Sequence, residues 1–201
     1  MAEQGRGKTT FLNALSDFIP KDERIVTIED SAELQIQGVA NLVKLEARNA
    51  NTEGVGEITI RDLLKTSLRM RPSRIIVGEV RGPEAIDMLQ SLNTGHSGAS
   101  SGHANSPEDM LSRLETMVLM GMEIPLQAVR RQIASAIDVI IHLGRLPDGS
   151  RKVLKVVEVI GCVDEEICTQ VLYEYEEEGG GIWIKQNELQ KRGKLLAAGY
   201  R

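Results

Sequence analysis

The segment near the amino end has residue types that can hold a phosphate group. Residues 5–10 read Gly-Arg-Gly-Lys-Thr-Thr, and apolar residues then recur at helical spacing as far as Ile19. Glycines let the backbone N–H groups curl around phosphate oxygens, a lysine meets the β- and γ-phosphates, and the hydroxyl after it ligates Mg²⁺. The residues predicted to bind the phosphates are Gly5, Gly7, Lys8, Thr9 and Thr10. Thr9 is also predicted to ligate the metal.

This segment departs from the complete phosphate-binding pattern. Ala2 stands where the pattern has a glycine, and Arg6 replaces the small residue that usually precedes Gly-Lys. The strand that normally leads into the loop, which would lie near the centre of the sheet, is not present in the sequence. Taken alone, the segment is equally consistent with an ordinary tail that contains glycine and lysine.

Two short apolar runs end in acidic residues. Ile25–Ile28 is followed by Glu29 and Glu33, and Arg74–Val77 is followed by Glu79. Runs that are apolar on both faces indicate strands of a parallel sheet covered by helices, and ligands bind at the carboxyl ends of such strands. Hydrolysis of a phosphoanhydride needs one carboxylate near Mg²⁺ and one near the γ-phosphate. A lone acid in such a place is usually a helix cap, but two such strands after a Gly-Lys-Thr turn favour a site.

A stretch rich in glycine and serine follows the second acid and holds two of the three histidines, His96 and His103. Their spacing is not a metal signature, because no third ligand lies at the usual distance along the chain. A loop that senses the γ-phosphate is the better interpretation. The third histidine, His142, lies in the apolar run Val139–Leu143, which is predicted to be another strand of the parallel sheet. His142 is therefore predicted to be a hydrogen-bonded core residue.

The helical and strand patterns divide the chain into two parts. Helices are predicted at 8–19, 60–69, 83–93, 107–120 and 125–137. After the turn Pro147-Asp148-Gly149, short strands are predicted at 153–160, 169–175 and 181–185, with a solvated turn at 174–178. The expected organisation is an α/β domain over residues 1–149, with a mainly parallel sheet. A small antiparallel β appendage over residues 150–201 is expected to pack on the same domain.

Composition narrows the function classes. The net charge is −5, from 24 Lys and Arg against 29 Asp and Glu, so no overall basic field attracts nucleic acid. No apolar run approaches the roughly 18 residues of a membrane span, so we expect a cytoplasmic protein whose membrane association depends on partners. Cys162 and Cys168 cannot form a paired Cys-x-x-Cys zinc site, and we expect buried free thiols rather than a disulfide.

Five motifs in order resemble the type II/type IV secretion ATPase superfamily, and in particular its tight-adherence pilus branch. They correspond to the Walker A, Asp box, arginine segment, Walker B and His box of that family, and they cover the chain up to about Gly149. The matching segments are 8–12 (KTTFL), 28–34 (IEDSAEL), 68–72 (LRMRP), 74–82 (RIIVGEVRG) and the histidine segment 95–105.

The resemblance implies a fold, a cofactor and partners. It implies the RecA-like, P-loop NTPase domain at the carboxy-terminal end of a homo-hexameric ATPase, which binds ATP and Mg²⁺. Such a protein lies at the cytoplasmic face of the inner membrane, where it contacts a platform protein of a secretion or pilus system. ATP hydrolysis there drives pilus assembly, pilus retraction or export.

The resemblance also implies roles by position. Lys8 and Thr9 would hold the phosphates and Mg²⁺, and Glu79 would lie beside the metal. Glu33 would polarise the attacking water, with Glu29 as the alternative. The residues that would contact or sense the γ-phosphate are Arg71 and His103, with His96 and Arg81 as further candidates.

The family's amino-terminal domain, which supplies arginines across the subunit seam, has no counterpart in this sequence. Either the chain is a fragment or another polypeptide supplies those parts. The alternative to a motor is a nucleotide-binding module that does not hydrolyse ATP, and the third hypothesis is a RecA-like motor acting on nucleic acid. The acidic charge balance disfavours this third hypothesis.

Overall fold

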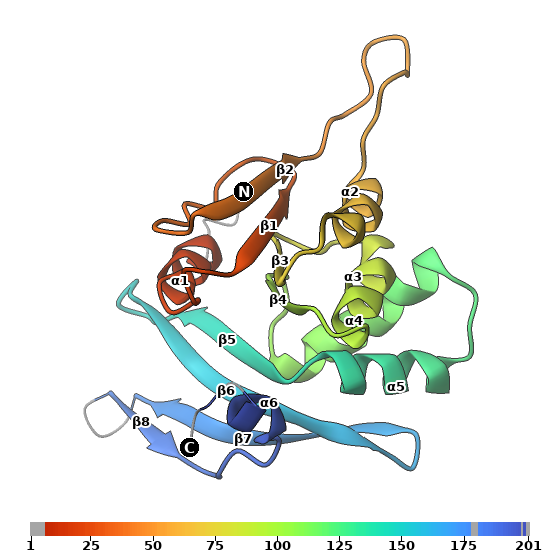
Figure 1. The fold of residues 1–201 in the computed structure, drawn as a ribbon. Helices are drawn as coiled ribbons and strands as arrows, with labels where there is room; N and C mark the ends of the chain where they lie inside the picture. The colour runs from red at the N-terminus through yellow and green to blue at the C-terminus, as the bar shows by residue number, and fades with distance from the viewer. Residues whose placement is uncertain (1–6, 178–180, 198, 200–201) are drawn as a thin grey trace.

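The computed structural model describes residues 7–177, 181–197 and 199. These residues form two four-stranded sheets, and helices cover both faces of the first sheet (Figure 1). The helices are α1 (Lys8–Ser16), α2 (Ile60–Ser67), the 3₁₀ turn η1 (Leu68–Met70), α3 (Glu84–Asn93), α4 (Pro107–Gly121), α5 (Leu126–Ala136) and α6 (Gly193–Ala197). The strands are β1 (Arg24–Glu29), β2 (Asn41–Glu46), β3 (Arg74–Val77), β4 (Ser97–Ser100), β5 (Val139–Arg145), β6 (Arg151–Val163), β7 (Glu166–Glu176) and β8 (Ile182–Lys185).

The first sheet is parallel and has the order β2-β1-β3-β4. Its two central strands are apolar on both faces because both faces are covered. Val26 and Ile28 of β1 belong to the large core, which α2 to α5 also form, whereas Ile25 packs on the opposite face with Leu34 and Ile76. This arrangement confirms the prediction of a parallel sheet that runs through both apolar runs.

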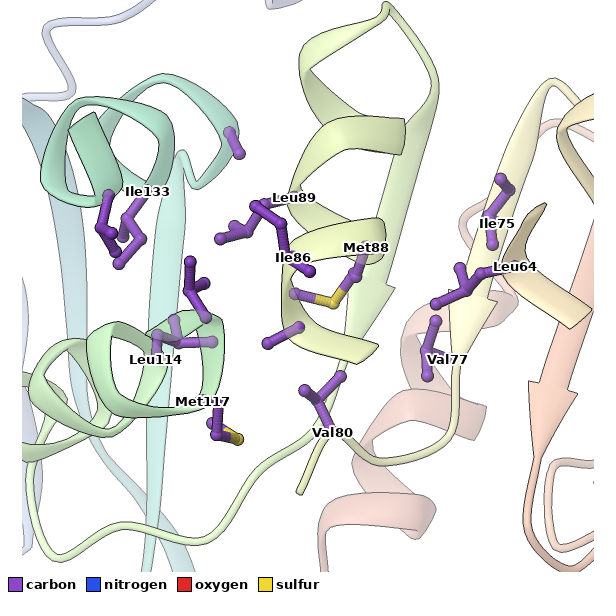
Figure 2. Close-up of a cluster of buried hydrophobic side chains, with 14 of the residues drawn as sticks. Leu64, Ile75, Val77, Val80, Ile86, Met88, Leu89, Leu114, Met117 and Ile133 are labelled. Carbon is purple, nitrogen blue, oxygen red and sulfur yellow. The ribbon is translucent and has the colours of Figure 1, made fainter. Parts of the chain in front are cut away.

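The large core lies between β3 and the helices, and Figure 2 shows how its side chains interlock. Leu64 of α2, Ile86 and Leu89 of α3, and Ile133 of α5 are all 1% exposed or less. Two helix starts are fixed by side chains as well as by packing. Thr59 and Asp62 form a reciprocal capping box at α2, and Ser106 caps α4 just before Pro107.

The second sheet is antiparallel, in the order β5-β6-β7-β8, and it begins earlier than the sequence suggested. The prediction that Val139–Leu143 is a parallel strand is wrong, because Val139 to Arg145 pair antiparallel with β6. The Pro147-Asp148-Gly149 turn is the reason. It closes a hairpin, in which Gly149 adopts a left-handed φ of 85° and Leu146 N–H donates to the Ser150 carbonyl at 2.9 Å. The antiparallel sheet therefore starts at residue 139 and not after residue 149.

Most of the other predicted elements are present, but some elements were missed and one predicted turn is partly wrong. The five predicted helices and the three strands of the tail are present, with ends shifted by a few residues. β2, β4 and α6 were not predicted. The predicted turn at 174–178 is wrong over Glu174–Glu176, which belong to β7, where Glu174 pairs with Lys155 at 2.8 Å; residues 178–180 lie outside the described part of the chain.

Three smaller predictions concern single residues and the membrane. Both cysteines are free, as predicted, but they are half-buried rather than buried. His142 is also half-buried, on β5. Within the described ranges, no helix is long and apolar enough to cross a membrane.

Candidate functional site

The amino end of α1 presents Lys8 and Thr9 at the carboxyl edge of the parallel sheet. Gly7 precedes the helix with φ 82° and ψ 18°, a left-handed conformation that glycine adopts without steric cost. Its carbonyl accepts the first helical hydrogen bond from Phe11 N–H at 2.9 Å. The predicted phosphate-binding residue Gly5 lies outside the described residues. Thr10 is exposed on the same first turn.

Glu79 is the centre of a charged cluster just beyond β3. Its Oε1 lies 3.7 Å from Lys8 Nζ and 3.0 Å from His103 Nε2. Arg81 Nη2 donates to its Oε2 at 2.8 Å. The structure thus brings together residues from three motifs, at the place where β3 and β4 both end.

The cluster keeps Glu79 ionised. Burial alone would raise the pKa of Glu79, but the hydrogen bond from Arg81 and the neighbouring Lys8 and His103 outweigh it, so the pKa lies below its ordinary value. The same contact with Glu79 raises the pKa of Arg81 further. A carboxylate held charged at a sheet edge is suited to binding a metal ion.

Glu29 and Glu33 have different surroundings, although both follow β1. Glu29 is only 4% exposed, and its Oε1 accepts the backbone N–H groups of Glu33 and Leu34 at 3.0 and 2.9 Å. A Cβ at Gly78 would lie 2.9 Å from Glu29 Cγ, so only glycine leaves room for this side chain. Glu33 is exposed. Glu29 therefore shapes the loop, and Glu33 is the carboxylate that the loop presents.

The side chains present suit Mg²⁺. The Thr9 hydroxyl donates to Glu33 Oε2 at 3.1 Å, and Glu79 lies beside Lys8 on the same edge. Hydroxyl and carboxylate oxygens are the hard ligands that Mg²⁺ prefers, and it is usually bound by one or two carboxylates together with substrate phosphates and water. Thr9 and Glu79 fit that pattern. The described residues hold no cluster of three or more His, Cys, Asp or Glu that would form a metal site without a substrate.

The structure does not bring Arg71 and His96 to this cluster within one chain. Both precede their strands, so they lie at the amino edge of the parallel sheet, opposite Glu79 and His103. Arg71 is exposed, with a left-handed φ of 53° after η1. His96 Nδ1 lies 3.1 Å from the Ser91 carbonyl.

A cleft of about 790 Å³ runs beside the cluster, between the parallel and antiparallel sheets. One wall is β4 and the stretch that follows it to His103, the other is β5, and Lys8 lies on its lining. In the described part of the chain β4 pairs only with β3, and β5 pairs only with β6. The cleft is therefore bounded by two strands that each have one unpaired edge.

A parallel sheet with a helix start, a lysine and two strand-end carboxylates at one edge is the arrangement of a nucleotide-binding protein. The sequence profile of the family described as "Type II/IV secretion system protein" matches residues 3–181. The chain belongs to this family.

Several similar proteins come from type IV secretion and conjugation. A putative conjugal transfer protein of Mycobacterium tuberculosis is 46% identical over 153 residues, which are 76% of this chain and 43% of that protein. The type IV secretion system protein VirB11 of Brucella suis is 40% identical over 146 residues, 70% of this chain and 40% of the relative. The chain thus spans less than half the length of these relatives.

Solved structures agree with the fold. The VirB11 ATPase of the Brucella suis type IV secretion system, solved with sulphate, aligns with a TM-score of 0.68 at 38% identity, covering 77% of this chain and 45% of that one. The pilus retraction motor PilT with bound ADP aligns with a TM-score of 0.59 over 96% of this chain and 51% of that one. Its 22% identity supports the fold alone.

Two contacts at the site escaped the sequence analysis. One is the close approach of Gly78 to Glu29, and the other is the place of Arg151, whose Cδ lies 3.2 Å from the position of a Cβ on Gly7. No local pattern could have shown either contact, because each joins segments that are far apart in the sequence.

Proposed function

We propose that this chain is the RecA-like nucleotide-binding module of an ATPase that powers secretion or pilus assembly. The observation that carries the proposal is the convergence of Lys8, Glu79 and His103 at the start of α1, with Lys8 Nζ 3.7 Å and His103 Nε2 3.0 Å from one carboxylate oxygen. Family membership and the similarity to the VirB11 ATPase support it. The tight-adherence pilus branch, the hexamer and the inner-membrane platform partner remain predictions.

Each residue has a role that follows from its position. The N–H groups at the start of α1 and the Lys8 amine bind the β- and γ-phosphates of ATP. Thr9 and Glu79 would hold Mg²⁺, which would supply the positive charge that neutralises the phosphate oxygens. Glu33 orients and polarises the attacking water, and Glu29 positions Glu33 by fixing the loop backbone. His103 and Arg81 hold Glu79 in place and lie close enough to respond to the γ-phosphate.

Binding of MgATP and MgADP to the 201-residue chain tests the proposal. Calorimetry on the wild type should show binding, and Lys8→Ala should weaken it by at least about tenfold, since one charge-assisted phosphate contact contributes roughly 1.5–3 kcal/mol. Lys21→Ala is the matched control, because the Lys21 amine contacts the Gln37 carbonyl instead. A wild-type chain that binds neither nucleotide would contradict the proposal, and so would equal losses in the two variants.

A second candidate is a module that binds nucleotide but does not hydrolyse it. The place of Arg71 favours this for the chain in isolation, because no described arginine of the arginine segment reaches the phosphate side of the sheet. An arginine supplied by a neighbouring subunit contributes on the order of 10³–10⁵ in rate. Phosphate release by the isolated chain should therefore be very slow. Release that is as fast as in an assembled full-length protein, and that Lys8→Ala abolishes, would refute this candidate.

A further inference from the structure

The β5–β6 hairpin reaches from the antiparallel sheet to the start of α1. Its turn lies beside α1 in Figure 1, and Arg151 is the first residue of β6. The Arg151 Cδ is 3.2 Å from the position that a Cβ on Gly7 would occupy, so the arginine stem passes directly over this glycine. Gly7 is the residue whose left-handed backbone starts α1. The hairpin therefore brings the stem of a cationic side chain to the residue that precedes α1.

The turn that carries Arg151 is well braced. Asp148 Oδ1 accepts the Ser150 N–H at 2.8 Å, and Arg145 Nε donates to the Gly149 carbonyl at 3.1 Å. These contacts fix the backbone just before β6. An arginine on such a turn loses less conformational freedom on binding than one on a free tail.

Two arginines face each other across the end of this hairpin. Arg145 and Arg151 are directly paired in the antiparallel register, so their side chains lie on the same face. Like charges in this position destabilise a sheet. Both residues are exposed, and in the described part of the chain no carboxylate forms an ion pair with either of them. An anion bound beside them would remove this repulsion.

The charge balance of the site also favours a further cation. Glu29, Glu33 and Glu79 lie at this edge of the sheet, and Arg81 is already engaged with Glu79. A nucleotide brings several more negative charges on its phosphates. Arginine suits this task because its planar guanidinium can donate two parallel hydrogen bonds to phosphate oxygens.

We propose that Arg151 binds the phosphates of the nucleotide held at Gly7–Thr9, so that the antiparallel sheet contributes directly to the binding site. This assignment rests on the proposed nucleotide-binding function. Gly7 leaves the space that the Arg151 stem requires beside the start of α1. Arg145 braces the turn and adds positive charge on the same face.

The test measures binding of MgATP, MgADP and adenosine to the wild type, Arg151→Ala, Arg151→Lys and Lys152→Ala. Lys152 is the matched control, because it is the next cation along β6 and its side chain points to the other face. Arg151→Ala should weaken ATP and ADP binding by at least about tenfold, as expected for a lost hydrogen bond to a charged group. Arg151→Lys should recover part of the loss, and adenosine binding should not change.

A second experiment uses the wild-type protein, so the proposal can be tested even if Arg151→Ala does not fold. Phenylglyoxal modifies accessible arginines, and mass spectrometry locates the modified sites. MgADP should protect Arg151 from modification, while Arg69, at the far edge of the sheet, should react as before. Unchanged reactivity of Arg151 at saturating MgADP would overturn the assignment, as would equal affinities of Arg151→Ala and Lys152→Ala. A wild-type chain that binds no nucleotide would instead refute the proposed function, and this assignment with it.

Discussion

Two strands, one in each sheet, carry a buried glutamate whose carboxylate accepts backbone hydrogen bonds. The two glutamates stabilise different parts of the molecule. Glu29 ends β1 of the parallel sheet and accepts the N–H groups of Glu33 and Leu34. Glu158, in the middle of β6, is fully buried and accepts the N–H groups of Gln190 and Lys191 at 3.0 and 2.6 Å. The first glutamate fixes a loop that exposes the Glu33 carboxylate, and the second fixes the segment that leads to α6. The same arrangement of hydrogen bonds therefore supports the proposed site in one case and the packing of the chain in the other.

The comparison predicts which property each variant should lose. A change on the Glu29 side should act mainly on turnover, since Glu33 is exposed at the proposed nucleotide site. A change at Glu158 should act mainly on the free energy of unfolding, because its hydrogen bonds join Gln170, Gln190 and Lys191, none of which belongs to the proposed site. The predictions below test that separation.

The largest effect is expected at Glu33. In the assembled full-length protein, Glu33→Gln should lower steady-state ATP hydrolysis by roughly 10²–10⁴, the usual contribution of a positioned acid or base. MgATP affinity should stay within a few-fold, because the amide keeps the size of the side chain. Glu79→Gln is the contrasting variant and should also raise the Mg²⁺ concentration needed for activity. Normal turnover in Glu33→Gln combined with loss in Glu29→Gln would reverse the roles assigned to these two acids.

The next effect is on folding. Glu158→Ala should lower the free energy of unfolding by roughly 3–4 kcal/mol, because it leaves two backbone N–H groups without their acceptor and removes one of the two acceptors of the Gln170 amide. Urea denaturation followed by circular dichroism measures this loss. Nucleotide affinity under native conditions should match that of the wild type. Glu166→Ala on the neighbouring strand is the control, since it removes only an exposed pairing with Arg130.

Glu29→Gln should lower both the stability and the turnover, each by less than the variants above. The amide oxygen can still accept hydrogen bonds, so stability should fall by only about 1–2 kcal/mol. Turnover should fall about tenfold, because a looser loop misplaces Glu33. The exposed neighbour Asp30, whose carboxylate lies 3.8 Å from Arg81, gives the control Asp30→Asn. The separation of roles breaks down if Glu29→Gln destabilises the chain as much as Glu158→Ala does while turnover stays normal.

The smallest effect is expected on how the free energy of unfolding changes at acidic pH. Burial alone would raise the pKa of Glu158, but hydrogen bonds from Gln190, Lys191 and Gln170 outweigh it and lower the pKa below its ordinary value of 4.5. The unfolded chain therefore takes up a proton first as the pH falls, so this stabilisation is complete above the ordinary value and is lost below it. Between about pH 5 and pH 3, the wild type should lose more stability than Glu158→Gln. Parallel slopes of unfolding free energy against pH would contradict this.

The sequence predicted those parts of the fold that local patterns specify. The apolar runs of β1 and β3 and the helical spacing of α1 to α5 placed Lys8, Glu33, Glu79 and His103 at one edge of a parallel sheet. β4 was missed because Ser97–Ser100 contains only serine, glycine and alanine, which have no strand pattern. β2 was missed because Asn41–Glu46 mixes charged and apolar residues at the edge of the sheet.

Long-range pairing accounts for the other errors. The run Val139–Leu143 suits either kind of sheet, and only the hairpin turn that follows decides between them. We used that turn as a domain boundary, whereas it joins β5 to β6. Arg71 and His96 were expected at the nucleotide because the resemblance places them in the arginine segment and the His box. Both precede their strands and so lie at the opposite edge of the sheet, and for His96 the strand β4 itself was not predicted.

In the described part of the chain β4 and β5 each have one unpaired edge, which affects how the isolated chain behaves in concentrated solution. A strand edge exposes a row of N–H and C=O groups that can template pairing with another chain. Such edges promote aggregation or strand exchange between copies unless a segment covers them. β4 adds to this hazard, because it has no charged side chain along Ser97–Ser100 to repel an approaching strand. The solubility of the chain should therefore depend on what covers this short serine- and glycine-containing strand more than on its net charge.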